Sequence, residues 1–265
     1  MSDAIHSDAP QSAAPAMIAL RGVRKVFPGP AGPVVAVDDL DVSVPKGEVL
    51  CIIGTSGCGK TTTMKMINRL VEPTAGTITV GGRDVRDREV TALRREIGYV
   101  IQRGGLFPHM TVAANISVLC RLERWEPERI ERRVTELLAL VNLPADEFAG
   151  RYPRELSGGQ CQRVGVARAL ALDPAIVLMD EPCGALDPIT RTQLHTEFTA
   201  LRTAMAKTIV MVTHDLHEAF TLGDRVALMD AGRIVQLGTE EDFVERPASS
   251  FVESFVRDHR RGAHA

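Results

Sequence analysis

A glycine-rich loop with the sequence GTSGCGKT, residues 54–61, places the strongest constraint on the fold of this chain. It follows Val49 to Ile53, a continuous apolar run typical of a strand that is buried on both faces. It precedes Lys60 to Val71, which we predict to be a helix. The loop fits the pattern GxxxxGK(S/T), in which backbone N–H groups face phosphate oxygens and the helix dipole favours negative charge. A chance match is the alternative, but the flanking strand and helix argue against it. The sequence therefore predicts an α/β fold that binds phosphate.

The side chains of this loop have separate predicted roles. Lys60 is placed to neutralise the β- and γ-phosphates of a nucleotide, and the hydroxyl of Thr61 to ligate Mg²⁺. The other loop residues that we expect to contact the nucleotide are Gly54, Thr55, Ser56, Gly57, Cys58, Gly59 and Thr62.

An acidic pair follows a second apolar run, Ile176 to Met179. Such a strand places Asp180 and Glu181 at the carboxyl edge of a sheet, where open α/β folds bind their ligands. Asp180 is expected to hold Mg²⁺, usually through water, and Glu181 to act as the general base for the attacking water. A helix N-cap with a solvated acidic pair is the alternative interpretation.

A second glycine turn, Leu156-Ser157-Gly158-Gly159-Gln160, precedes a helix that we predict over Val164 to Ala171. A Ser-Gly-Gly turn at the start of a helix is a second anion-binding helix N-terminus in the same chain. On its own, the turn is also compatible with a flexible connection.

The remaining sequence suggests one domain with two tails. Residues 1–16 are rich in Ala, Ser, Asp and Pro without periodicity and are predicted to be a disordered tail. We expect one folded domain over residues 17–256 and a C-terminal tail over residues 257–265. The helical periodicity of Glu128 to Val141 indicates a helical subdomain, about residues 103–165, inserted between two strand-rich halves.

Further elements are expected in the strand-rich halves. Short apolar runs predict strands at Ile97 to Ile101 and at Ile209 to Val212. A helix is expected between Arg191 and Met205. The segment Val226 to Leu237 is predicted to be a β-hairpin.

Composition excludes several classes of protein. The formal net charge of −3 argues against a nucleic-acid binder, which would usually carry a basic face. No apolar run approaches the roughly 20 residues that span a bilayer, so a membrane role requires a partner. The five cysteines are widely spaced and form no CxxC pair, so we expect free thiols rather than disulfides or a zinc site. They are Cys51, Cys58, Cys120, Cys161 and Cys183.

Taken in order, these motifs resemble those of ABC-transporter ATPases over almost the whole chain. The resemblance implies an α/β P-loop NTPase cassette: a RecA-like core, an antiparallel β subdomain and an inserted α-helical subdomain. It also implies that Phe27 stacks on adenine and that Gln102 contacts both Mg²⁺ and the attacking water. Asp187 would lie in a loop that crosses a dimer seam, and His214 would contact the γ-phosphate.

In this family two cassettes stack head to tail, which accounts for two anion-binding helix ends in one chain. Residues Ser157, Gly158, Gly159 and Gln160 of one chain would cap the ATP that the phosphate loop of the other chain holds. We therefore expect a second ATPase subunit as a partner, most simply as a homodimer. Because Cys58 lies in the phosphate loop and Cys183 follows the acidic pair, we also expect thiol alkylation to block hydrolysis and ATP to protect.

Within the family, the sequence is most similar to importer ATPases for osmoprotectants. The similarity lies in residues 65–70 (KMINRL), 72–74 (EPT), 98–102 (GYVIQ) and 106–112 (LFPHMTV). It implies ATP-driven uptake of glycine betaine, choline, carnitine or proline, with membrane permease subunits and an extracytoplasmic binding protein as partners. The chain would be peripheral on the cytoplasmic face of the membrane. Many such ATPases continue into a pair of regulatory domains, and because this sequence ends at Ala265 we expect that pair to be absent.

The apolar side chains of Leu106, Phe107 and Met110 lie in an otherwise turn-like loop and are suited to grip a short permease helix. Packing inside the helical subdomain is the alternative. Other functions remain open: an importer ATPase for another small solute such as an amino acid, an exporter subunit, a soluble ABC ATPase, or a cassette that binds ATP without hydrolysis. The single cassette and negative charge argue against the soluble class, and the presence of Glu181 and His214 argues against the last.

Overall fold

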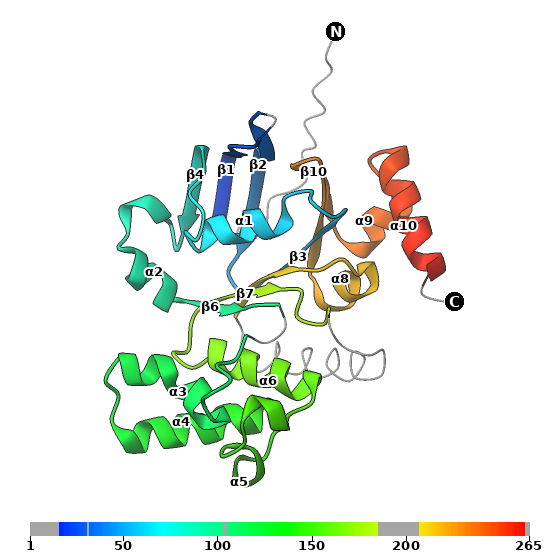
Figure 1. Cartoon of the computed structure of the whole chain (residues 1–265). Coiled ribbons are helices and arrows are strands. Elements are labelled where there is room, and N and C mark those ends of the chain that lie inside the picture. Colours follow the sequence, from blue (N-terminus) through cyan, green and yellow to red (C-terminus); the bar gives the residue numbers. More distant parts are fainter. Residues whose placement is uncertain (1–15, 31, 103–104, 185–206, 263–265) are drawn as a thin grey trace.

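The structure, a computed structural model, describes residues 16–30, 32–102, 105–184 and 207–262 (Figure 1). Two sheets and the helices packed around them make up most of these ranges. No helix within them is long and apolar enough to cross a bilayer.

The larger sheet has six strands in the order β10-β9-β3-β8-β7-β6. The strands are β3 (Val49–Gly54), β6 (Ile97–Val100), β7 (Ile176–Asp180), β8 (Thr208–Val212), β9 (Arg225–Asp230) and β10 (Arg233–Gly238). Five of them run parallel, and β10 pairs antiparallel with β9 as the predicted hairpin. Because parallel strands end at the same edge, the loops that follow β3, β8, β7 and β6 emerge close together.

The smaller sheet is antiparallel, in the order β2-β1-β4-β5. Its strands are β1 (Ala16–Phe27), β2 (Val34–Pro45), β4 (Ala75–Val80) and β5 (Arg83–Asp84). The alternating residues Leu40, Val42 and Val44 of β2 are all buried, as expected for a strand with one face on a core.

Helices surround the larger sheet (Figure 1). Helices α3 to α6 gather in one layer beyond β6 and β7, α1 lies beside the antiparallel sheet, and α8 to α10 lie at the other end. Their bounds are α1 (Lys60–Ile67), α2 (Val90–Arg95), α3 (Val112–Leu122), α4 (Pro127–Leu140), α5 (Ala145–Phe148), α6 (Gly158–Ala169), α8 (Leu216–Leu222), α9 (Glu240–Glu245) and α10 (Ser250–Gly262), with 3₁₀ turns η1 (Val85–Asp87) and η2 (Pro153–Glu155).

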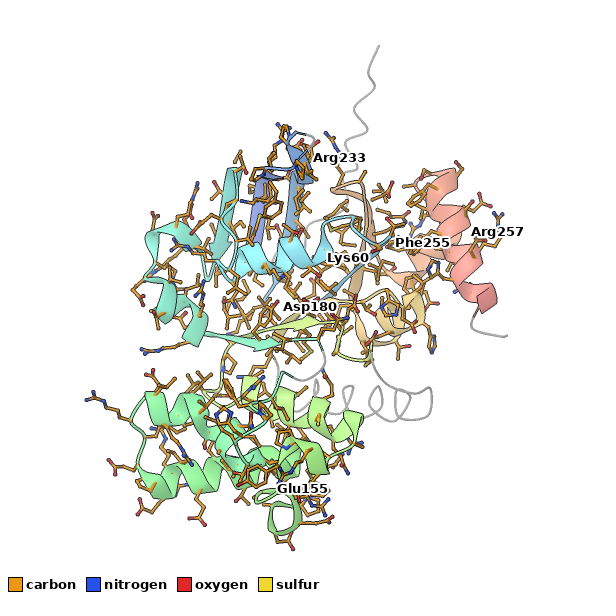
Figure 2. The ribbon with its side chains drawn as sticks, viewed as in Figure 1. Lys60, Glu155, Asp180, Arg233, Phe255 and Arg257 are labelled. Atoms are coloured by element: carbon orange, nitrogen blue, oxygen red, sulfur yellow. The ribbon has the colours of Figure 1, made fainter. Side chains whose placement is uncertain are left out.

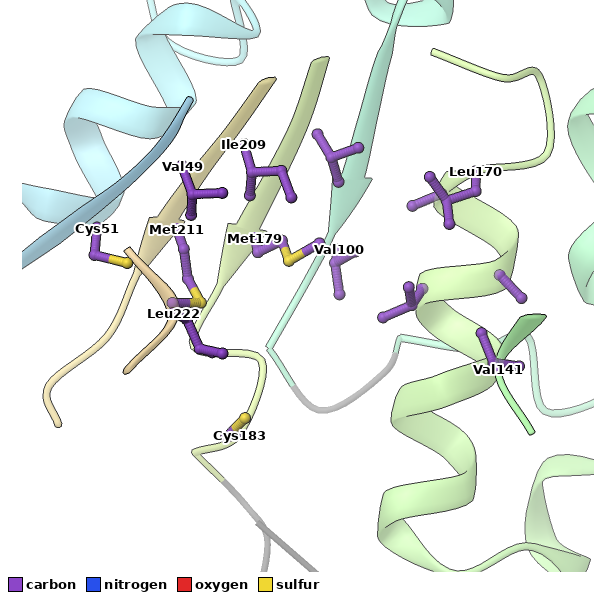
Figure 3. Close-up of a cluster of buried hydrophobic side chains, with 14 of the residues drawn as sticks. Val49, Cys51, Val100, Val141, Leu170, Met179, Cys183, Ile209, Met211 and Leu222 are labelled. Atoms are coloured by element: carbon purple, nitrogen blue, oxygen red, sulfur yellow. The ribbon is translucent and has the colours of Figure 1, made fainter. Parts of the chain in front are cut away.

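The strand β3 is buried on both faces and separates two apolar cores. Val49, Cys51 and Ile53 belong to a core that includes residues of the helical layer, such as Val141 and Leu170 (Figure 3). The alternate residues Leu50 and Ile52 belong to a second core that β3 shares with α1 and the antiparallel sheet. The phosphate loop therefore starts from a strand that is fixed from both sides.

Two helix boundaries differ from prediction. Helix α1 ends at Ile67 instead of Val71, because Arg69 adopts a left-handed conformation with φ of 47°. The Arg69 guanidinium then donates hydrogen bonds to the carbonyls of Val85 and Arg88, at 3.0 and 2.9 Å. Helix α6 begins at Gly158, six residues before the predicted start.

The C-terminal helix α10 continues through Gly262, beyond the predicted boundary of the domain at Val256. Val252 and Val256 are buried on one side of this helix, and His259 is stacked on Phe255 with ring centroids 4.1 Å apart. These contacts between residues four positions apart stabilise the helix within the segment that was predicted to be a tail. The helix expected between Arg191 and Met205 lies outside the described residues.

Candidate functional site

Four loops meet at the carboxyl edge of the parallel strands. The phosphate loop follows β3, and the acidic pair lies at the end of β7. His214 follows β8, and Gln102 follows β6. Figure 2 shows Lys60 and Asp180 near each other at this edge. The topology therefore brings together residues that are far apart in sequence, at the place where open α/β sheets bind ligands.

The backbone of the phosphate loop depends on glycine at two positions. Gly54 has φ of 145°, and a Cβ there would lie 2.1 Å from the carbonyl oxygen of Met229. Gly59 has φ of 104°, and a Cβ there would lie 2.3 Å from the carbonyl oxygen of Ala36. Both conformations and both close approaches exclude a side chain. The loop is thus packed against β9 on one side and β2 on the other.

Lys60 lies inside the curve of this loop and is 8% exposed. Its ammonium donates hydrogen bonds to the carbonyls of Gly54 and Thr55, at 2.8 and 2.9 Å. Thr55, Ser56 and Gly57 form the exposed rim, while Cys58 is buried. A positive charge surrounded by a curled backbone is an arrangement suited to phosphate.

Thr61 and Asp180 form the contact between the two motifs. The Thr61 hydroxyl donates a hydrogen bond of 3.2 Å to Asp180 Oδ1. Burial raises the pKa of the Asp180 carboxyl, and the nearby Glu181 carboxylate adds to this, whereas the Thr61 hydrogen bond and the charges of Lys65 and Lys60 act in the opposite direction. The ionised form of Asp180 is therefore disfavoured, because these favourable contacts do not offset the free-energy cost of its burial.

Two of the predicted catalytic residues lie beside one carboxylate oxygen of Glu181. Gln102 Nε2 donates a hydrogen bond of 2.5 Å to Glu181 Oε2. His214 Nδ1 lies 3.7 Å from the same oxygen. The side chain of Glu181 is 25% exposed and that of His214 is 56% exposed, so water reaches the group. The structure thus brings Gln102, Glu181 and His214 together.

The backbone of Glu181 is also unusual. Its φ of 46° lies in the left-handed region, which non-glycine residues seldom adopt. The conformation is held by two hydrogen bonds: Glu181 N donates to Val212 O at 2.8 Å, and Gly184 N donates to Glu181 O at 3.2 Å. Backbone strain of this kind is concentrated at functional sites, where the surrounding structure over-determines it.

The donor set at this edge fits Mg²⁺. The Thr61 hydroxyl and the Asp180 carboxylate provide hard oxygen ligands, and a divalent cation would offset the unfavourable charge of Asp180. Gln102 would add an amide oxygen. Within the part of the chain that is described, no cluster of three or more His, Cys, Asp or Glu residues forms a complete metal site. Mg²⁺ usually binds through few protein ligands together with phosphates and water, so this set suffices.

The second anion-binding turn is built as a helix cap. The Ser157 hydroxyl accepts a hydrogen bond from Gln160 N at 3.3 Å, and Gln160 Oε1 accepts one from Ser157 N at 2.9 Å. This capping box starts α6 at Gly158 and explains its early beginning. Ser157 and Gly158 are exposed. Figure 2 places Glu155, two residues before Ser157, at the far end of the helical layer from Lys60.

The order and geometry of these motifs agree with a comparison to known families. The family model described as ABC transporter matches residues 37–184, more than half of the 265-residue chain. This chain belongs to the ABC transporter family.

Curated ABC relatives match most of the chain. The choline transport ATP-binding protein OpuBA of Bacillus subtilis is 52% identical over 92% of this chain, which spans 63% of the length of that relative. The glycine betaine uptake system ATP-binding protein YehX of Escherichia coli is 49% identical over 90% of this chain and 76% of its own length. Among solved structures, the dimeric ABC cassette MJ0796 in a post-hydrolysis state, bound to ADP and Pi, matches with a TM-score of 0.76. That match has 32% identity and covers 84% of this chain and 98% of the other.

Three further residues belong to the predicted site. Phe27, predicted to stack on adenine, is the last residue of β1 and is half-buried. Asp187, predicted to cross the dimer seam, lies outside the described residues. Thr62, in the first turn of α1, is half-buried beside Thr61.

Sequence reasoning overlooked the support of His214. The buried Thr213 hydroxyl donates to the carboxylate of the buried Glu218 and accepts from Asp215 N at 3.1 Å. Asp215 in turn caps α8, accepting from the backbone N–H groups of His217 and Glu218. His214 is therefore held between two fixed neighbours. The spacing Asp215-x-x-Glu218, similar to a capping box, is the sequence signal that could have revealed this support.

Tyr99 was also not predicted. Burial, and then the charge of Asp180, raise the pKa of the Tyr99 phenol above its ordinary value. The Tyr99 phenol therefore stays protonated near the Asp180 carboxylate.

Proposed function

We propose that this chain is the ATP-binding and ATP-hydrolysing subunit of an ABC importer for an osmoprotectant such as glycine betaine, choline, carnitine or proline. The observation that carries the catalytic part is the convergence of Gln102 and His214 on one oxygen of Glu181, beside the Thr61–Asp180 pair. A phosphate loop alone would support binding. A carboxylate with two orienting partners supports hydrolysis.

Each residue has a distinct part in the reaction. Lys60 and the loop N–H groups would bind and orient the β- and γ-phosphates. Bound Mg²⁺ would neutralise charge on the phosphates, and Thr61 and Asp180 would hold it. Glu181 Oε2 would accept the proton of the attacking water, while Gln102 and His214 orient that carboxylate and the water. The proton would thus pass from the water to Glu181 Oε2 as the water oxygen bonds to the γ-phosphorus, while the bond from that phosphorus to the β–γ bridging oxygen breaks and ADP leaves.

A second copy of the chain would complete each site. Ser157 and Gly158 are exposed at a helix N-terminus. Glu155, two residues before Ser157, lies away from Lys60 of the same chain (Figure 2). An exposed helix N-terminus can cap the γ-phosphate held by a partner chain. The dimeric state of the MJ0796 cassette supports this arrangement. We therefore include a homodimer in the proposal, with ATP bound between the chains.

A groove beside the loop 105–111 would bind a permease. A hollow of about 440 Å³ is lined by residues of this loop and α3 together with Tyr152. Its surroundings expose apolar side chains: Phe107 is 41% exposed, Leu122 66% and Tyr152 36%. The fully buried Asn115 holds the loop by donating to three carbonyls and accepting from Phe107 N. A short amphipathic helix of an integral membrane permease fits such a preformed apolar groove.

The substrate class rests on the relatives. Those named for choline and glycine betaine transport are 52% and 49% identical over nine-tenths of this chain. The solute itself would be bound by an extracytoplasmic binding protein that docks on the permease. The chain would then be peripheral on the cytoplasmic face of the membrane, without contact to nucleic acid.

The test is ATP hydrolysis by the chain reconstituted in liposomes with its co-purified permease and binding protein. Glycine betaine, choline, carnitine, proline and an unrelated amino acid would be compared, with Glu181→Gln as the control. Stimulation by an osmoprotectant that the control loses is the expected result. Stimulation only by the unrelated amino acid would replace the substrate class and keep the ATPase. Absence of any membrane partner would reject the importer.

A further inference from the structure

The ammonium group of Lys25 lies over the ring of Phe27. Its Nζ is 4.7 Å from the ring centroid. The two residues are two positions apart in β1, so their side chains leave the same face of the strand. Both are half-buried. At this distance a cation is attracted by the negative face of an aromatic ring, so one face of Phe27 is occupied.

The strand β2 links this pair to the phosphate loop. Lys25 pairs with Val37 and Phe27 with Val34 across the β1–β2 register. The loop touches β2 next to Val37, because a Cβ on Gly59 would lie 3.2 Å from Val37 Cγ2. Three strand residues, about 10 Å, separate this contact from Val34. A nucleotide with its phosphates in the loop is long enough to bring its base to Phe27.

We propose that Lys25 is a positioning residue for the nucleobase, which acts by covering one face of Phe27 and leaving the opposite face for the base. The proposal rests on the proposed ATP binding. Phe27 has no polar group, so its contact with a base depends entirely on stacking. A cation on one face fixes the ring orientation and draws π-electron density toward itself, which favours a second ring on the other face. The neighbouring cation Arg24 does not share this role, since it is paired with Asp38 at 3.3 Å.

The test compares two ligands that differ in the base. Binding of ATP and of inorganic triphosphate to Lys25→Met and to the wild-type chain would be measured by calorimetry. Loss of a cation–π contact at a half-exposed site predicts about two- to fivefold weaker ATP binding. Triphosphate binding should not change. Lys25→Arg should bind ATP like the wild type, and Lys46→Met, which removes an exposed lysine elsewhere, should have no effect on either ligand.

A double-mutant cycle shows whether Lys25 acts through the ring. In a Phe27→Ala background, Lys25→Met should cause no further loss of ATP affinity. A further loss there, equal weakening of ATP and triphosphate, or unchanged or tighter ATP binding by Lys25→Met would overturn the proposal. If the wild-type chain binds ATP no more tightly than triphosphate, the base adds nothing to binding, and both the proposed role of Lys25 and the proposed specificity for ATP are rejected. If it binds neither ligand, the proposed function itself is rejected.

Discussion

The substitution Asp180→Asn tests whether the Asp180 carboxylate lowers the stability of the folded chain while it serves to bind a cation. Burial raises the pKa of Asp180, so its ionised form is disfavoured in the folded chain. Taking a carboxylate partly out of water costs on the order of 2 kcal/mol. Asparagine has the same shape and still accepts the hydrogen bond from the Thr61 hydroxyl. Exchanging a charged acceptor for a neutral one loses about 1 kcal/mol.

The net expectation is a more stable but inactive protein. The free energy of unfolding should rise by about 1 kcal/mol, or roughly 2–4 °C in melting temperature for a chain of this size. Hydrolysis should fall at least about 100-fold, because Mg²⁺ loses a ligand that contributes several kcal/mol in the transition state. Trp125, the single tryptophan of the chain, provides a fluorescence signal for urea denaturation.

The same variant predicts a pH dependence. For an acid whose pKa is raised by folding, the folded state takes up a proton more readily than the unfolded state. The cost of the ionised group is therefore fully present above the raised pKa and disappears as the pH falls through it toward the ordinary value of 3.8. The stability advantage of Asp180→Asn over the wild type should accordingly be largest near neutral pH and shrink on acidification.

The matched control is a substitution of an exposed aspartate. Asp258→Asn removes the same charge from a side chain that is 69% exposed, and it should change stability by less than about 0.5 kcal/mol without affecting hydrolysis. The reasoning is refuted if Asp180→Asn is less stable than the wild type, or if it hydrolyses ATP at more than a tenth of the wild-type rate.

Three further predictions follow from the geometry of the site. Glu181→Gln should lower phosphate release by about 10²–10⁴-fold while ATP affinity stays within a few-fold, and a retained rate would remove Glu181 as the base. Gly59→Ala should lower the free energy of unfolding by at least about 2 kcal/mol in urea, because the residue has φ of 104° and its Cβ would lie 2.3 Å from a carbonyl oxygen of β2; unchanged stability would contradict this loop geometry. Alkylation of the native chain, followed by peptide mapping, should show the half-exposed Cys161 modified first, because Cys58 and Cys183 are only 4% and 1% exposed. Loss of hydrolysis should follow the slower modification of Cys58 and Cys183. Inactivation at the same rate as Cys161 modification would contradict this order.

The sequence was most informative where local chemistry and local structure coincide. The glycine pattern around Lys60 and the apolar strand before Asp180 are both short-range signals, because a phosphate loop needs adjacent glycines and a buried strand needs a continuous apolar run. The structure has the strands β3 and β7 where these signals placed them. The hairpin β9–β10 was likewise predicted from a turn signal between two strand-like runs.

What could not be read from the sequence depends on contacts between distant residues. Gln102 and Glu181 are 79 residues apart, and only the pairing of β6 with β7 brings them together. The end of α1 at Ile67 depends on carbonyls that accept from Arg69 across the following loop. The left-handed conformation of Glu181 leaves no trace in composition or periodicity, since non-glycine residues rarely adopt it and no pattern requires it here.

The position of Glu181 has a consequence for coupling. The two side chains that contact Glu181 follow different strands. Gln102 follows β6 and precedes the loop 105–111, which leads toward the helical layer, whereas His214 follows β8 in the middle of the sheet. The carboxylate therefore has both contacts only when the loop after β6 and the sheet keep their present relation. A partner that displaces the loop 105–111 would change the contact to Gln102 while the contact to His214, fixed by Thr213 and Asp215, remains. If Glu181 is the proton acceptor, as proposed, the Gln102–Glu181 hydrogen bond would link this acceptor to the groove on the helical side, and hydrolysis would respond to what binds there.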